Sequence, residues 1–93
     1  MVERNVTVVN RLGLHARAAA KLVRATNEFR SSVRLERRGG GPPADAKSIL
    51  SVLMLAAARG TELRVSAEGE DEAGAVEAVC ALVESGFGEG AAV

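Results

Sequence analysis

Apolar and polar residues alternate along three short stretches of the chain, as they do in strands that have one face buried. The apolar positions are Val6 and Val8 in residues 2–9, Val33 and Leu35 in residues 31–38, and Leu63, Val65 and Ala67 in residues 61–69. The turn-rich stretch GGGPP follows the second of these, and a short further strand is expected after it, near Ala44. We therefore predict a sheet of four strands.

Two other stretches have apolar residues at the spacing of an amphipathic helix. The first extends from Ala16 to about Phe29, and the second covers residues 71–87, with Asp71 near its start and Gly86 just past its end. The positions expected to face the core are Ala19, Leu22, Val23 and Phe29 in the first helix, and Val76, Val79, Cys80 and Val83 in the second. Each helix therefore has one side to bury against the sheet.

A third helical segment, residues 44–60, has an unusual distribution of apolar residues. Ser48 is a suitable N-cap, and the segment is expected to end near Arg59 and Gly60. Its apolar residues surround the axis; they are Ile49, Leu50, Val52, Leu53, Met54 and Leu55. A helix that is apolar all round is either buried on every side or contacts a partner, and in so small a chain we favour the partner.

Length and element order together define the fold class. The 93 residues suit one domain, which we place at residues 1–88, with a loose C-terminal tail at residues 89–93. The elements follow the order strand, helix, strand, weak strand, helix, strand, helix. This order predicts an α+β fold of two layers, with the helices on one face of a mainly antiparallel sheet.

Composition and charge argue against several classes of function. Twelve basic and twelve acidic residues cancel, and Trp and Tyr are absent, so the composition does not favour nucleic-acid binding. Cys80 and His15 are the only residues of their types and cannot fill a four-ligand zinc site, so we expect no metal. The apolar runs are too short to span a bilayer, and no leader pattern follows Met1. We expect a cytoplasmic protein without membrane insertion.

His15 is the candidate reactive residue. It directly precedes the first helix, where the first backbone N–H groups lack partners within the helix and the dipole attracts anions. The same field disfavours a positively charged ring, so a neutral ring nitrogen is available to take a phosphoryl group. Arg17 lies in the first turn, and its guanidinium can fold back towards the ring to help hold a dianion. The simpler alternative is an ordinary surface histidine.

Three ordered segments of the chain resemble the HPr family, the histidine phosphocarriers of the bacterial phosphoenolpyruvate-dependent phosphotransferase system. The segments are NRLGLHARAAAKLV at residues 10–23, AKSILSVLMLAAARG at residues 46–60 and VSAEGEDEAGAVEAVCALVESGFGE at residues 65–89. The resemblance covers nearly the whole chain. The LHAR start and the SGFGE ending look more like the nitrogen-related and other proteobacterial members than the enteric sugar-branch form.

The resemblance implies a phosphocarrier that needs no cofactor and is not a stand-alone enzyme. His15 would accept a phosphoryl group at Nδ1 from phosphorylated Enzyme I and pass it to an EIIA-type domain. Arg17 and the backbone of Ala16 and Arg17 would hold that group. The fold would be an open-faced sandwich, a four-stranded sheet with three helices on one face. The residues expected to meet partners are Ala20, Arg24, Lys47, Ile49, Leu50, Leu53 and Met54.

The pathway served by such a carrier would be sugar uptake or nitrogen and carbon regulation, and we expect a monomer. Ser48 aligns with the family's regulatory serine, which HPr kinase/phosphorylase modifies in some bacteria. A phosphate there would be favoured by the helix start and by Lys47, but would add charge to the docking patch. Alternatively, Ser48 only caps the helix.

Other functions remain as alternatives. The main one is a regulatory binding protein that acts mainly through Ser48 phosphorylation and the adjacent apolar patch. A small RNA-binding module has less support because the strands carry no aromatic residues. A stand-alone enzyme has less support because one histidine without a visible substrate pocket suits relay of a group better than turnover.

Two features depart from the family pattern. Ala18 stands where many members have proline directly after the active-site arginine. Alanine is the best helix former, so the helix should persist, with a slightly less preorganised His15 loop. The GGGPP loop also looks longer than usual, but it lies away from the motifs, and loops tolerate insertion.

Overall fold

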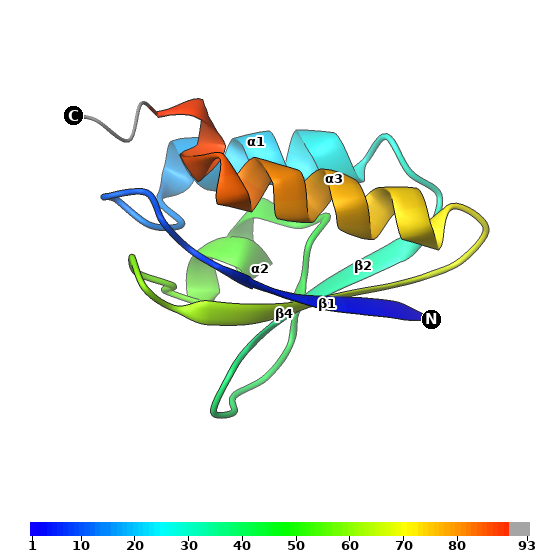
Figure 1. The fold of residues 1–93 in the computed structure, drawn as a ribbon, viewed down its shortest axis with the longest axis horizontal. Helices are drawn as coiled ribbons and strands as arrows, with labels where there is room; N and C mark the ends of the chain where they lie inside the picture. Colours follow the sequence, from blue (N-terminus) through cyan, green and yellow to red (C-terminus); the bar gives the residue numbers. More distant parts are fainter. Residues whose placement is uncertain (90–93) are drawn as a thin grey trace.

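The computed structural model describes residues 1–89, which form one sheet with helices packed against it (Figure 1). The elements are β1 (Val2–Thr7), α1 (Ala16–Thr26), β2 (Ser32–Arg37), β3 (Ala44–Asp45), α2 (Ile49–Met54), β4 (Glu62–Glu68), α3 (Glu72–Glu84) and a 3₁₀ turn, η1 (Gly86–Gly88). The strand order is β1-β4-β2-β3, and every neighbouring pair is antiparallel. The predicted α+β fold is confirmed. Residues 90–93 of the predicted tail lie outside the described residues.

The core lies between the sheet and a layer in which α1 and α3 run side by side (Figure 1). All apolar positions predicted for the strands are buried, and so are the four predicted for the last helix. Of the positions predicted for the first helix, Ala19 and Leu22 are buried, while Val23 and Phe29 are half-buried against the core. Period alone therefore identified the buried faces, because each element has one side in the core.

The first helix is shorter than predicted, because polar side chains at its end bind backbone carbonyls. α1 ends at Thr26 and does not reach Phe29. The Thr26 hydroxyl donates to the carbonyl of Val23 at 3.0 Å, and the Asn27 side-chain amide donates to the same carbonyl at 2.8 Å. The Thr26 hydroxyl also donates to the carbonyl of Ala46 at 2.7 Å, which ties the end of α1 to the segment before α2. Side chains thus bind a carbonyl of the last turn, as they commonly do where a helix ends.

The helix predicted over residues 44–60 is confirmed only at Ile49–Met54. Beyond it, Ala56 has a positive φ of 50°. The Arg37 guanidinium of β2 donates to the carbonyl of Leu55 at 2.8 Å, and Leu14 donates its N–H to the carbonyl of Ala57 at 2.9 Å. Groups distant in the sequence thus form hydrogen bonds with the carbonyls of this segment. Its local pattern could therefore not predict where the helix ends.

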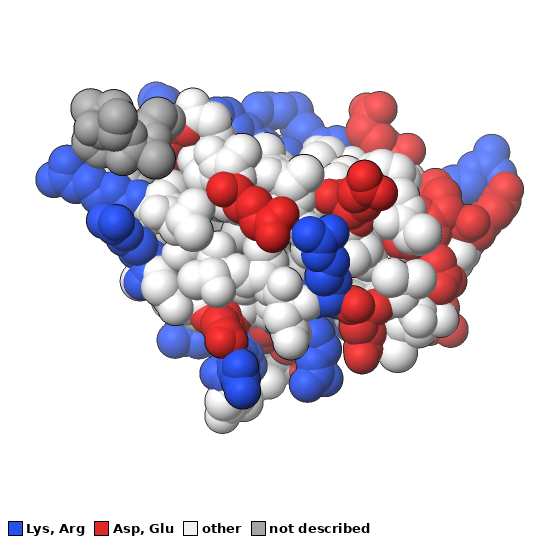
Figure 2. Space-filling model, viewed as in Figure 1, with Lys and Arg blue, Asp and Glu red and all other residues white. Residues whose placement is uncertain are grey.

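Charged side chains differ between the two ends of the helical layer (Figure 2). Lys and Arg side chains gather at the end where β1 leads into α1, and Asp and Glu side chains predominate near the turn between β4 and α3. The neutral sum of the sequence therefore hides a separation of charge. His15 lies at the positive end.

Candidate functional site

A fixed turn places His15 at the start of α1. Gly13 has a φ of +64°, which favours glycine, and a Cβ at this position would lie 2.4 Å from the carbonyl oxygen of Ala57. The next residue, Leu14, is buried and donates its N–H to the same carbonyl at 2.9 Å. The loop therefore packs directly against the segment after α2, which fixes the position of His15.

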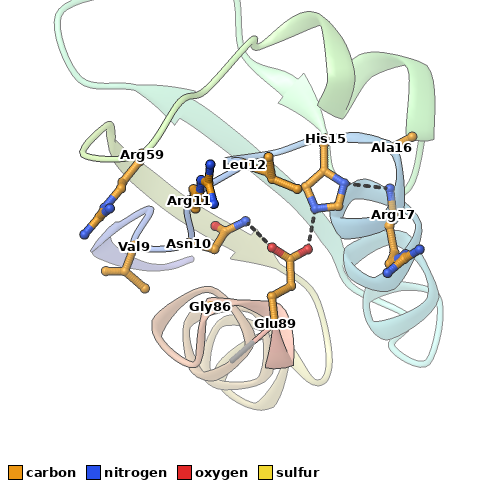
Figure 3. A pocket seen from close by; sticks show the side chains of 10 residues that line it. All are labelled: Val9, Asn10, Arg11, Leu12, His15, Ala16, Arg17, Arg59, Gly86 and Glu89. Carbon is orange, nitrogen blue, oxygen red and sulfur yellow. Dashed lines mark hydrogen bonds and ion pairs between the residues drawn. The ribbon is translucent and has the colours of Figure 1, made fainter. Parts of the chain in front are cut away.

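His15 is the N-cap of α1, as predicted, with an extended backbone (φ −79°, ψ 179°). Its Nδ1 accepts a hydrogen bond from the backbone N–H of Arg17 at 3.3 Å. Its other ring nitrogen, Nε2, contacts the carboxylate of Glu89 (Figure 3). In a neutral ring, these two contacts favour the proton on Nε2 and the lone pair on Nδ1. The nitrogen beside the helix amides is therefore the nucleophilic one.

Glu89 and Asn10 belong to the site although sequence reasoning did not identify them. Asn10 Nδ2 donates to Glu89 Oε1 at 3.0 Å and to the carbonyl of Gly13 at 2.8 Å. The hydrogen bonds from Asn10 and His15 lower the pKa of Glu89 below its usual range. Sequence analysis assigned Glu89 to the tail. Its contact with His15 could not be predicted, because it depends on the η1 turn that brings the chain back to α1.

A pocket of about 650 Å³ opens beside the histidine (Figure 3). Its lining comes from the β1–α1 loop, the start of α1, the turn before β4, and η1 with the residue that follows it. The lining residues are Val9, Asn10, Arg11, Leu12, His15, Ala16, Arg17, Arg59, Gly86 and Glu89. Three of the lining residues are arginines and one is a carboxylate, so the charge of the pocket favours binding of an anion or an acidic surface. Arg11 and Arg59 were not predicted: Arg11 lies in the same loop as His15, whereas Arg59 reaches the pocket only through the fold.

Arg17 and Ala16 occupy the first two positions of α1 and are exposed. The Arg17 guanidinium points away from the imidazole, and it is the backbone N–H of this residue that contacts Nδ1 (Figure 3). The expected fold-back of the guanidinium towards the ring is therefore absent in this conformation. An exposed arginine side chain can still turn towards an anion bound at Nδ1.

The residues expected to meet partners occupy α2, its N-terminal flank and the neighbouring α1. Leu50 and Met54 are 69% and 76% exposed, and Ile49 is also exposed. Leu53 is half-buried against the core, and Lys47 donates its Nζ to the carbonyl of Phe29 at 2.8 Å. On α1, Ala20 is half-buried and Arg24 is exposed. Of the apolar residues predicted to meet partners, only Ile49, Leu50 and Met54 are therefore exposed.

Ser48 caps α2, as predicted. Its Oγ accepts a hydrogen bond from the backbone N–H of Ser51 at 3.3 Å, and the residue is half-buried. Leu50 and Met54 follow it on the exposed side of the same short helix. A modification of Ser48 would therefore act directly on the apolar patch.

A sequence model described as the PTS HPr component phosphorylation site matches residues 2–85. The chain belongs to the HPr family. Its HPr-family relatives include the phosphocarrier protein HPr of Cupriavidus necator, 46% identical over 90 residues that cover 97% of this chain and 99% of the relative. The phosphocarrier protein NPr of Proteus mirabilis is 45% identical, over 92% of this chain and 94% of the relative.

Solved HPr structures have the same fold. The crystal structure of HPr-C-His from Thermoanaerobacter tengcongensis superposes with a TM-score of 0.90 at 38% identity, covering 97% of this chain and 99% of that one. The chain is thus a member of the HPr phosphocarrier family of the phosphotransferase system, as the resemblance implied. Within residues 1–89, none of the helices has the length and apolar character needed to cross a membrane.

Proposed function

We propose that His15 accepts a phosphoryl group at Nδ1 from phosphorylated Enzyme I and passes it to an EIIA-type domain. The observation that carries this proposal is the orientation of the ring: Nδ1 lies beside the first amides of α1 at an open pocket, while Nε2 contacts Glu89. A nitrogen with a free lone pair at a helix start is suited to attack phosphorus, because the amides and the dipole stabilise the arriving anion.

Each transfer exchanges one bond to phosphorus for another. The bond between phosphorus and the donor breaks and its electron pair stays with the donor, while the Nδ1 lone pair of His15 forms the new bond. The backbone N–H of Arg17, which donates to Nδ1 in the free protein, then faces a phosphoryl oxygen. The Arg17 side chain is free to turn towards the same group and offset its charge. Transfer onwards to EIIA is the reverse of this step.

Partner docking involves two adjoining surfaces in this proposal. Arg11, Arg17 and Arg59 surround the pocket and attract an acidic surface, and Leu50 and Met54 offer apolar contacts on α2. Charge accelerates the encounter, and buried apolar area stabilises the complex. The protein acts as a monomer in the cytoplasm, and a panel of sugar-type and nitrogen-type EIIA acceptors identifies the branch that it serves.

The direct test is phosphorylation from phosphoenolpyruvate. We expect the protein, incubated with phosphoenolpyruvate and its Enzyme I, to gain the mass of one phosphoryl group and to lose it in mild acid, as phosphohistidine does. His15→Ala should gain nothing. No gain in the native protein, or an unchanged gain in His15→Ala, would contradict the proposal.

A second candidate function is regulation through Ser48, favoured by its position at the start of the helix that carries the exposed Leu50 and Met54. A phosphate on Ser48 would add about two negative charges beside the apolar patch and weaken its contacts. The corresponding test uses ATP and an HPr kinase/phosphorylase. An acid-stable phosphate that is lost in Ser48→Ala supports this function, and the absence of any acid-stable phosphate contradicts it.

A further inference from the structure

We propose that Glu89 is a positioning residue for phosphoryl transfer: its carboxylate, aimed by Asn10, holds the proton on Nε2 of His15 and thereby directs the Nδ1 lone pair towards the phosphoryl donor. The inference rests on the proposed function of His15. It starts from the contact between the Glu89 carboxylate and Nε2, which lies on the opposite edge of the ring from the Arg17 amide (Figure 3).

Asn10 fixes the orientation of the carboxylate. The residue is 3% exposed, and its Nδ2 group donates both to Glu89 Oε1 at 3.0 Å and to the carbonyl of Gly13 at 2.8 Å. Both partners are acceptors, so only the NH₂ end of the amide can face them. Its buried Oδ1 has no hydrogen-bond partner among the described residues. The orientation that lets the amide donate to Glu89 therefore leaves its own oxygen without a hydrogen bond.

The backbone around Glu89 is also held in place. Phe87 is 1% exposed, and its carbonyl accepts a hydrogen bond from Lys21 Nζ of α1 at 2.6 Å. The N–H of Glu89 donates to the carbonyl of Gly86 at 3.1 Å. The buried ring and these bonds fasten η1 to α1, so Glu89 reaches His15 from a supported turn.

The chemistry gives this carboxylate more to do in the phosphorylated state than in the free state. When the neutral ring attacks through Nδ1 and keeps its Nε2 proton, the ring becomes positively charged as the new bond to phosphorus forms. No proton needs to leave. A carboxylate that accepts a hydrogen bond from Nε2 interacts more strongly with this charged ring than with the neutral one. Glu89 therefore stabilises the phosphorylated form preferentially.

The other charged groups at the site cannot replace Glu89. The remaining charged residues that line the pocket, Arg11, Arg17 and Arg59, are cations, and so is Lys21, which faces Glu89 from α1. They favour the phosphoryl group but oppose a positive ring. Within the described lining, Glu89 is the one carboxylate, and it lies on the side of the ring away from the phosphoryl group.

The first test lets two proteins compete for one phosphoryl group. Phosphorylated, ¹⁵N-labelled native protein is mixed with unlabelled Glu89→Gln and a catalytic amount of Enzyme I without phosphoenolpyruvate. Mass spectrometry then measures how the group partitions at equilibrium. We expect about threefold to tenfold preference for the native protein, the range for a partly exposed, charge-assisted contact. Partition near unity would overturn the proposal.

Two further variants are matched controls for the competition. Glu84→Gln also removes one carboxylate at the end of α3, but Glu84 contacts Arg4 at 3.4 Å and not the site, so its partition should stay near unity. Glu89→Asp keeps the charge and should recover part of the preference. Loss of phosphoryl by Glu84→Gln to the same extent as by Glu89→Gln would count against a specific contact.

The second test examines the unphosphorylated ring and therefore does not depend on Enzyme I. The ¹⁵N chemical shifts of the imidazole report which nitrogen carries the proton. We expect the Nε2–H tautomer to predominate in the native protein and the Nδ1–H fraction to rise several-fold in Glu89→Ala. Equal tautomer ratios in the two proteins would overturn the positioning role. If neither protein accepts phosphate, the phosphocarrier function fails, and this ring measurement still decides the role of Glu89.

Discussion

The two ends of the helical layer use polar groups in opposite ways. At the start of α1, His15 and Glu89 face an open pocket with three arginines. At the start of α3, the Asp71 carboxylate is bound by the protein itself: it accepts hydrogen bonds from the backbone N–H groups of Arg30 and Ser31, both at 2.9 Å, and from the Ser31 hydroxyl. One end keeps polar groups available for a ligand, and the other uses them to join the segment before β2 to α3.

This comparison leads to separable effects of mutation. Substitutions of polar side chains at the His15 end should change phosphoryl transfer while stability changes little, and substitutions at the Asp71 end should do the opposite. Residues that shape the His15 loop should affect both properties.

His15→Ala should abolish phosphorylation by Enzyme I completely but cost only about 1–2 kcal/mol of unfolding free energy. The cost is small because the side chain makes one capping hydrogen bond with α1 and one partly exposed contact with Glu89. Intact mass and urea unfolding measure the two effects. A loss of several kcal/mol would show that the histidine is a structural residue, contrary to the comparison.

Gly13→Ala should destabilise the protein by about 2–4 kcal/mol, because it combines an unfavourable positive φ with overpacking. The new Cβ would lie 2.4 Å from the carbonyl of Ala57. Transfer should slow as well, since the turn positions His15. Gly40→Ala is the matched control: its φ is also positive, at +114°, but no atom lies within 4 Å of the new Cβ. Equal losses of stability in both variants would contradict this account.

Arg17→Ala should slow phosphoryl transfer about tenfold, the range expected when one charged hydrogen bond to the phosphoryl group is lost. The backbone N–H that faces Nδ1 is retained, so the site should remain active. Stability should change by less than about 0.5 kcal/mol, because the side chain is exposed. Rapid-quench transfer from Enzyme I measures the rate. The transfer rate of Arg17→Lys should lie between those of the native protein and Arg17→Ala. A native rate in Arg17→Ala would show that the guanidinium takes no part in transfer.

Asp71→Ala should lower the unfolding midpoint at pH 7 without affecting phosphorylation of His15. The Ser31 hydroxyl, and then the backbone N–H groups of Arg30 and Ser31, lower the pKa of Asp71 from 3.8 to about 2. Its ionised form therefore stabilises the fold above pH 3.8, and this contribution is lost as the pH falls towards 2.

Unfolding midpoints measured between pH 7 and pH 2 test this sign. The midpoint difference between the native protein and Asp71→Ala should narrow as the solution is acidified. Glu70→Ala is the control, because Glu70 is largely exposed and pairs with Arg30 only at 3.8 Å. If Asp71→Ala changed phosphorylation and not stability, the distinction between the two ends would be wrong.

The sequence predicted the fold well where each element carries its own pattern. Alternation located the strands, and the helical spacing in residues 71–87 placed Val76, Val79 and Val83 in the core. The prediction was wrong where distant groups decide the outcome. α2 ends early because Arg37 and Leu14 bind the carbonyls that follow it. No local periodicity records those contacts.

The candidate site divides in the same way. His15, Ala16 and Arg17 are neighbours in the chain, so their position at a helix start could be predicted from one segment. Glu89 comes from 74 residues further along and meets His15 only because α3 and η1 return to α1. Arg59 likewise reaches the pocket through the fold. Sequence reasoning identified His15 as the candidate residue, and the structure supplied its surroundings.

In the proposed function, the start of α1 makes Nδ1 of His15 the phosphoryl acceptor, with Nε2 turned to Glu89. NMR of the phosphorylated, ¹⁵N-labelled protein tests this directly, because coupling to ³¹P identifies the nitrogen that carries the phosphoryl group. We expect coupling at Nδ1, with the proton retained on Nε2. Coupling at Nε2, or phosphate on a residue other than His15, would contradict it.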